Sequence, residues 1–210
     1  MRRPFLASLF GALSLCVTAV AHAQRGPVSY VYLRGTDTLG VETLTAFPDR
    51  WVGALTMKGQ PTIEWTHARA ANDRLGALRI RVLQPPPGAS APPIQDVLFS
   101  MKGDSLQVSI STGTNRSSQT VRSPSPDMVP LVNASVLHAA FVADYGARRK
   151  LDRIPIVLTT GAQTADAFLA KDGAVSVLTL GKVSMRITPA TDGIPQRIDI
   201  PAQNSRVVRR

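Results

Sequence analysis

The sequence predicts a mainly β protein: a curled antiparallel sheet, half-barrel or lipocalin-like, with one helix packed on its concave face. Three observations predict this fold class. Apolar and polar residues alternate with a period of two after residue 27, short turns rich in Gly and Asp recur, and one segment has helical periodicity. Half-buried strands are typical of antiparallel sheets, and a long meander must curl or close to protect its edges.

Residues 1–23 have the pattern of a secretory signal peptide. Two arginines form a basic start, an uncharged apolar stretch follows, and an Ala-His-Ala tripeptide ends at Ala23. The apolar stretch is shorter than the ~20 residues that a spanning helix needs. We therefore expect cleavage near Ala23, a periplasmic or extracellular location, and a single β-rich domain over 24–210 without a transmembrane segment.

The strands and turns follow in order along the chain. Alternation marks strands at 79–82, 106–111, 183–188 and 198–200, and turns delimit further strands at 28–34, 38–46, 94–101, 163–170 and 174–180. Short turns separate several of them, and their Gly and Asp residues tolerate a positive φ. The proline-rich segment 85–93 is expected to be a surface loop, because proline cannot donate to a β-ladder.

One segment, 133–145, has the pattern of an amphipathic helix, and the proline-rich stretch 123–130 leads into it. Asn133 is the expected N-cap and Gly146 the expected stop. Leu137, Phe141 and Tyr145 fall on one stripe at spacings of four. The stripe should pack on the concave face of the sheet.

The inner face of the curl is the candidate binding site. The candidate residues are Trp65, His67 and Phe99 from the sheet and Leu137, Phe141 and Tyr145 from the helix. Two interpretations remain open. The helix either fills the core in the ordinary way or acts as a lid over a hydrophobic pocket.

Catalytic and metal chemistry find little support. The single Cys lies in the expected signal peptide, which excludes disulfides and thiolate sites from 24–210, and two histidines are too few for a three-histidine zinc site. We expect no metal and no cofactor. His67 should be a satisfied core histidine, His138 should lie at the helix surface or an interface, and Glu64 should face solvent.

The chain is basic, with 24 Lys and Arg against 14 Asp and Glu and a formal net charge of +10. Two clusters stand out, Arg148–Lys150 with Arg153 and the tail residues Arg206, Arg209 and Arg210. A solvated surface explains them, and attraction to an anionic envelope component is the alternative. Nucleic acid is not an expected partner, since no recognition motif is present and aromatic residues make up only 5%.

A resemblance supports the same architecture. Segment 30–42 looks like the first hairpin of uncharacterised exported bacterial proteins, and segments 103–105 and 201–204 continue the likeness. The order of elements over 28–204 resembles the half-barrel of periplasmic lipoprotein carriers, in which an incomplete barrel wraps a helix and holds acyl chains. No carrier site residue has a matching position here, so the resemblance implies only a fold and a lipid-handling role.

These observations favour a non-enzymatic exported envelope protein of unknown function that binds a lipid or another hydrophobic or amphiphilic molecule. A structural or protein-interaction module of the envelope, using its basic surface and sheet edges, is the first alternative. A secreted hydrolase whose site is assembled in space around His67 or His138 is the second, although the sequence lacks a Gly-x-Ser-x-Gly motif.

Overall fold

A computed structural model describes residues 26–69, 75–84, 92–122 and 125–210. The expected signal peptide, 1–23, and positions 85–91 of the proline-rich loop lie outside the described residues. In the described part, no helix is long and apolar enough to cross a membrane.

The described strands form one fifteen-stranded sheet with two wings. The N-terminal wing comprises β1 (Val28–Arg34), β2 (Asp37–Ala46), β3 (Arg50–Met57), β4 (Thr62–Arg69), β5 (Leu75–Leu83), β6 (Gln95–Lys102), β7 (Ser105–Thr112) and β8 (Asn115–Arg122). The C-terminal wing comprises β9 (Val129–Leu131), β10 (Arg153–Leu158), β11 (Thr164–Asp172), β12 (Val175–Leu180), β13 (Val183–Pro189), β14 (Pro195–Ile200) and β15 (Ser205–Arg209). A 3-10 turn, η2 (Pro201–Gln203), joins β14 to β15.

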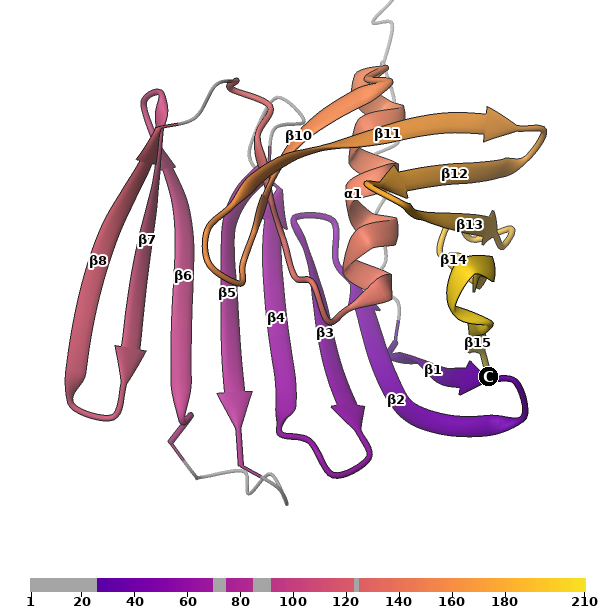
Figure 1. Cartoon of the computed structure of the whole chain (residues 1–210), viewed down its shortest axis with the longest axis horizontal. Helices are drawn as coiled ribbons and strands as arrows, with labels where there is room; N and C mark the ends of the chain where they lie inside the picture. Colours follow the sequence, from indigo (N-terminus) through magenta and orange to yellow (C-terminus); the bar gives the residue numbers. More distant parts are fainter. Residues whose placement is uncertain (1–25, 70–74, 85–91, 123–124) are drawn as a thin grey trace, which may run out of the picture.

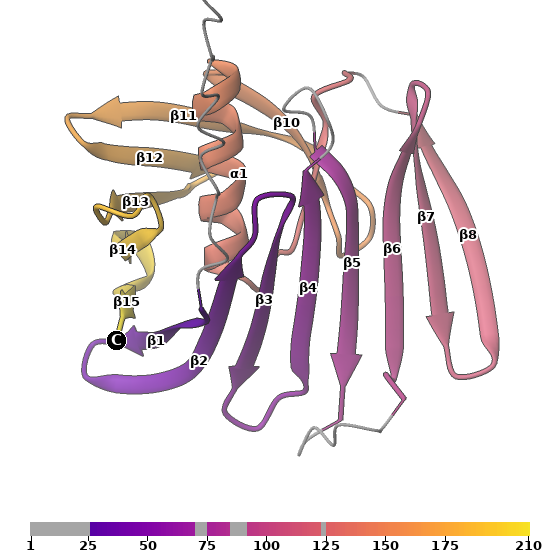
Figure 2. The same cartoon turned by 180° about the vertical axis from the view of Figure 1, so that it is seen from behind.

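The wings meet where β1 pairs with β15, so the first and last strands are neighbours in the middle of the sheet. All neighbours are antiparallel except β9 and β10, which run parallel. Strands β8 and β9 occupy the two ends of the strand order. Figures 1 and 2 show the sheet bending between the wings without closing, which confirms the predicted curled sheet.

The inner face of the curl carries the core. Across β4, β5 and β6, the row Trp65, Ile80 and Val97 is buried. The next inward-facing row, which lies two residues along each strand, is buried as well. This is the period-two alternation that the sequence predicts. Strand β8 was not expected, because its mostly polar residues are nearly all exposed and give no alternation signal.

Helix α1 (Val136–Arg149) lies inside the curl and contacts β3 of one wing and β9, β11, β12 and β14 of the other. The predicted helix is confirmed, but both of its ends are shifted. Ser135, not Asn133, is the N-cap, and its hydroxyl accepts the backbone N–H of His138. The helix also continues past Gly146 to Arg149, and the C-cap Lys150 adopts a left-handed φ of 56°.

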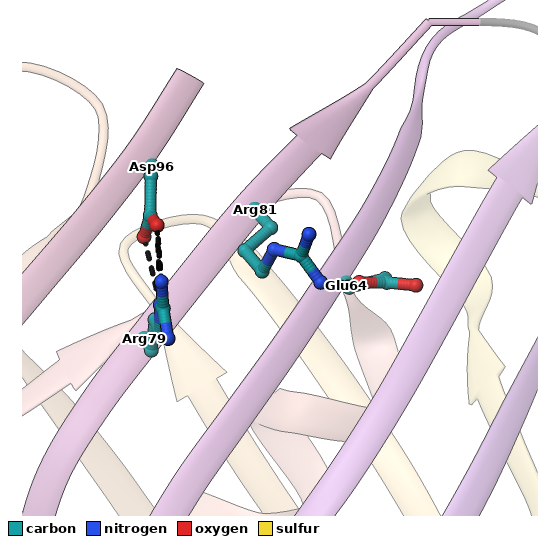
Figure 3. A network of polar contacts seen from close by, with 4 residues as sticks. All are labelled: Glu64, Arg79, Arg81 and Asp96. Atoms are coloured by element: carbon teal, nitrogen blue, oxygen red, sulfur yellow. Dashed lines mark hydrogen bonds and ion pairs between the residues drawn. The ribbon is translucent and has the colours of Figure 1, made fainter. Parts of the chain in front are cut away.

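Ion pairs cover much of the outer face. On β4, β5 and β6, Arg79 contacts Asp96 and Arg81 contacts Glu64 at 3.1 Å (Figure 3). Glu64 therefore faces outward, as predicted.

Most of the predicted basic clusters are also paired. The pairs are Arg148 with Asp144, Arg149 with Asp127, Arg153 with Asp166, and Arg209 with Asp192, at 2.7–3.1 Å. Pairing within the fold accounts for these residues without an external partner.

Candidate functional site

All six predicted site residues are buried inside the curl, none more than 1% exposed. Trp65 and His67 lie on β4, Phe99 on β6, and Leu137, Phe141 and Tyr145 on α1. His67, Leu78 and Phe99 form one row across β4, β5 and β6. Tyr145 lies nearer the C-terminal end of α1, and its hydroxyl donates to Asp127 at 2.8 Å.

Stacked rings join the helix to the sheet. The His67 and His138 rings are nearly parallel, with centroids 5.0 Å apart, and Phe141 lies 4.8 Å from His67. Trp65 meets His138 edge-on at 4.7 Å, and Trp51 meets Phe141 at 5.0 Å. His138 is thus completely buried between α1 and β4, so of the two expected places the exposed helix surface is wrong and an interface, here that of helix and sheet, remains. A residue beside Leu137 is buried because sheet surrounds the helix on more than one side.

Glu42 on β2 is the centre of a buried polar network that the sequence analysis missed. The indole Nε1 of Trp65 donates to Oε1 of Glu42 at 2.8 Å, and the Ser135 hydroxyl donates to the same oxygen at 2.6 Å. The Tyr32 hydroxyl donates to Oε2, and it accepts the backbone N–H of Val136 at 3.0 Å. The carboxylate therefore organises the first turn of α1.

Strand alternation could have located Glu42 inside. Leu44 shares its parity with Glu42, while Thr43 and Thr45 lie on the other face. Leu44 and Glu42 are both fully buried, and Val41 is 41% exposed. Hydrophobicity alone hides this signal, since it places Val41 inside and Glu42 outside.

Burial determines the ionisation of the network. Desolvation raises the pKa of Glu42, although hydrogen bonds from Ser135, Tyr32 and Trp65 act against this shift. Desolvation and the neighbouring Glu42 raise the pKa of Tyr32 well above its usual value. Tyr32 therefore stays protonated and can donate its hydrogen to the carboxylate.

The histidine pair has a defined hydrogen-bond direction. The backbone N–H of Val132 donates to Nδ1 of His138 at 3.2 Å, so the neutral His138 ring carries its hydrogen on Nε2. That Nε2 lies 2.9 Å from Nδ1 of His67 and donates to it. His67 then carries its own hydrogen on Nε2, which has no partner among the described residues. The expected satisfied core histidine is thus satisfied on one nitrogen only.

Desolvation keeps both rings neutral at pH 7. It lowers the pKa of His67 to about 3. It also lowers the pKa of His138 well below its usual value, and the neighbouring His67 adds to this shift.

A close approach of the backbone makes room for Trp65. Gly53 on β3 pairs with Trp65 on β4, and a Cβ at position 53 would lie 2.2 Å from the indole ring. Only glycine lets the indole lie across β3 and reach Glu42.

The arrangement does not form a nucleophile and base pair. The imidazole of His138 bonds to His67 and to the backbone of Val132, whereas the Ser135 hydroxyl donates to Glu42. Among the described residues, no group of three His, Cys, Asp or Glu side chains could hold a metal ion. The polar side chains inside the curl are engaged in hydrogen bonds and are surrounded by apolar residues.

Comparisons with known proteins give no family. No family model matches the chain, and no curated protein matches it. One solved structure, a beta-barrel-like protein of a domain of unknown function (DUF1849) from Brucella abortus, is similar at 10% identity and a TM-score of 0.46, covering 88% of this chain and 93% of that chain. The interpretation of the site therefore rests on the side chains of this chain.

Proposed function

We propose that the protein is an exported, non-enzymatic envelope protein that binds an amphiphilic molecule inside the curl of its sheet. One observation carries the proposal: Nε2 of His67 is a buried donor without an acceptor among the described residues. An unpaired buried polar group costs about 1–3 kcal/mol, so such a group calls for a partner. The signal-peptide pattern of 1–23 supports export.

The surroundings of His67 fit a ligand with an oxygen acceptor and an apolar tail. Phe99 and Leu78 follow His67 along one row of the sheet, and Phe141 of α1 faces it. A carboxyl, ester or phosphate oxygen would accept the Nε2 hydrogen, and the tail would lie against the apolar row.

Entry of the ligand would require α1 to move away from the sheet. The strand order leaves β8 and β9 at separate ends of the sheet, so the curl is not a closed barrel. Movement of the helix would break the contacts of Ser135 and Val136 with Glu42 and Tyr32. These hydrogen bonds would hold α1 against the sheet until a ligand enters.

Locking α1 to the sheet tests the proposal. Arg69 of β4 and Asp144 of α1 form an ion pair at 3.3 Å, so cysteines at these two positions can be bridged by a short bifunctional thiol reagent. The probe is dansyl-labelled undecanoic acid, whose fluorescence rises in an apolar site. The exported protein should enhance the fluorescence, and the bridged double variant should not. The same double variant without the reagent is the matched control.

A second variant separates the binding role of His67 from its packing role. His67→Phe keeps a ring in the stack and removes the unpaired donor. It should remain folded and bind the probe more weakly. Absence of binding by the unmodified protein, or equal binding by the bridged and unbridged forms, would refute the proposal.

One observation favours a protein-interaction module as the second candidate function. Strand β8 is eight residues long, is exposed on nearly every residue and pairs with β7 alone among the described strands. Its free edge can accept a further strand. In this case partner binding should weaken with salt and in Arg116→Glu, because Arg116 is an exposed cation on that edge.

A further inference from the structure

We propose a separate site on the outer face of the C-terminal wing that binds a phosphoryl group. A cavity of ≈ 590 Å³ lies over β13, β14 and β15 and is bordered by the β1–β2 turn at Gly35. Arg186, Arg197, Asp199 and Arg206 supply its charged lining. Nothing in the proposed interior site uses these side chains.

Strand register brings the charges together. Arg186 on β13 pairs with Asp199 on β14, and Asp199 pairs with Arg206 on β15. Neighbouring strands are about 4.8 Å apart, so the two arginines start about 10 Å apart on either side of the carboxylate. The adjacent row Ile187, Ile198 and Val207 is buried in the core, which places the charged row on the outside.

The three guanidinium groups are not equally engaged. Arg197 holds both carboxylate oxygens of Asp199, at 2.6–2.9 Å. Arg186 donates to Asp172 at 2.7 Å, but the Asp172 side chain is 65% exposed. Arg206 has an exposed side chain and no ion pair among the described residues. The charge of Asp199 is therefore balanced, and the cavity keeps an excess of positive charge.

This distribution favours a phosphoryl group as the ligand. Exchanging Arg186 from Asp172 to a ligand costs little, because both side chains of this ion pair are exposed and exposed ion pairs contribute little to stability. Arg186 and Arg206 can then approach one anion from opposite sides. A phosphoryl group offers three oxygens in different directions to two bidentate arginines, whereas a carboxylate offers two oxygens in one plane. The Ser205 hydroxyl also lines the cavity, and it donates its hydrogen to the carbonyl of Gln203 at 3.0 Å.

Two probes distinguish a soluble phosphate ester from a lipid headgroup. Glycerol 3-phosphate is titrated into the exported protein by calorimetry. Phosphatidylcholine vesicles with and without phosphatidylglycerol are tested by co-sedimentation. Arg206→Gln should weaken binding at least about tenfold, which corresponds to about 1.4 kcal/mol, since it removes a charge-assisted hydrogen bond to the anion. Arg122→Gln on β8 removes an equal charge from the far edge of the sheet and is the matched control.

A variant that removes a negative charge from the cavity tests the same site, because it should strengthen anion binding. Asp199→Asn releases Arg197 and should tighten binding. Asp96→Asn makes the same charge change at the Arg79 ion pair of Figure 3 and should leave binding unchanged.

Each outcome decides between a specific phosphoryl site and nonspecific electrostatic attraction of anions to a basic protein. Binding of glycerol 3-phosphate that depends on Arg206 supports a soluble phosphate ester. Vesicle binding that depends on Arg206 without binding of the soluble probe supports a lipid headgroup. Equal effects of the pocket variants and their controls, or no binding of either probe, would overturn the site.

Discussion

Tyr32 shows how one hydroxyl can hold two elements together. It donates to Glu42 on β2 and accepts from the first turn of α1. Strand alternation could have placed Glu42 inside, but the sequence does not show which groups would bond to its carboxylate. Those partners come from β1, β4 and the helix cap, and only the fold brings them together.

Replacing Tyr32 by Phe should destabilise the protein by about 1–3 kcal/mol, since a buried carboxylate oxygen and the Val136 N–H both lose a partner. Tyr30→Phe is the matched control, because the Tyr30 hydroxyl donates to the carbonyl of Pro195 at 2.7 Å and has no side-chain partner among the described residues. Urea unfolding measures both changes. A loss in Tyr30→Phe as large as in Tyr32→Phe would contradict the importance assigned to Glu42.

The histidine pair predicts an acid-sensitive fold. The folded pKa of His67 is lowered from 6.5 to about 3, so its contribution is complete above pH 6.5 and is lost as the pH falls towards 3. Glu42 acts in the opposite sense, because its folded pKa is raised and its contribution is lost as the pH rises. The melting temperature should therefore fall between pH 6.5 and 3.

Two variants separate these contributions. The fall in melting temperature should be smaller in His67→Phe, which no longer titrates at this position. It should be steeper in Glu42→Gln, which loses the opposing effect. Identical pH profiles for the two variants and the unmodified protein would show that neither group controls acid stability.

At the scale of elements, the sequence located α1 but misplaced its ends. Asn133 and Ser135 are both good cap residues, and local propensity cannot choose between them. Tertiary contacts make the choice: Ser135 reaches Glu42, whereas the Asn133 side chain accepts the backbone N–H of Thr159 at 3.1 Å. Gly146 stays within the helix because Ile154 packs against it, and a Cβ there would lie 2.3 Å from that side chain.

Ser135→Ala should cost about 1–2 kcal/mol, since it removes the cap of α1 and one donor to Glu42. Asn133→Ala should cost less, because its contact with Thr159 is exposed. Thermal unfolding followed by circular dichroism compares the two. The reverse order would show that Asn133 is the working cap.

For the whole molecule, alternation and turn chemistry predicted a curled antiparallel sheet with one enclosed helix, and the structure confirms it. The pairing of β1 with β15 could not be predicted, since no local signal links strands at opposite ends of a sequence. Strand β8 was missed because an exposed edge strand needs no apolar face. The polar network around Glu42 could not be predicted either, because its members come from three segments that are distant in the sequence.

Export predicts a specific mass for the processed chain. Expression of all 210 residues in a bacterial host with a periplasm should yield a protein that begins at Gln24, because the signal-peptide pattern predicts cleavage after Ala23. Intact-mass spectrometry of the periplasmic fraction measures this directly. A full-length chain retained in the cytoplasm would contradict the signal-peptide interpretation.

The seam between β1 and β15 also has a consequence for how the chain acquires its fold. Most strands can pair with the strand made just before them, so each wing can grow from fast local hairpins. The seam must wait for the last strand, and closing so long a loop is slow. Until then β1 presents a bare edge. A bare strand edge is a template for pairing with other chains, so intermolecular association should compete with folding until β15 has been made.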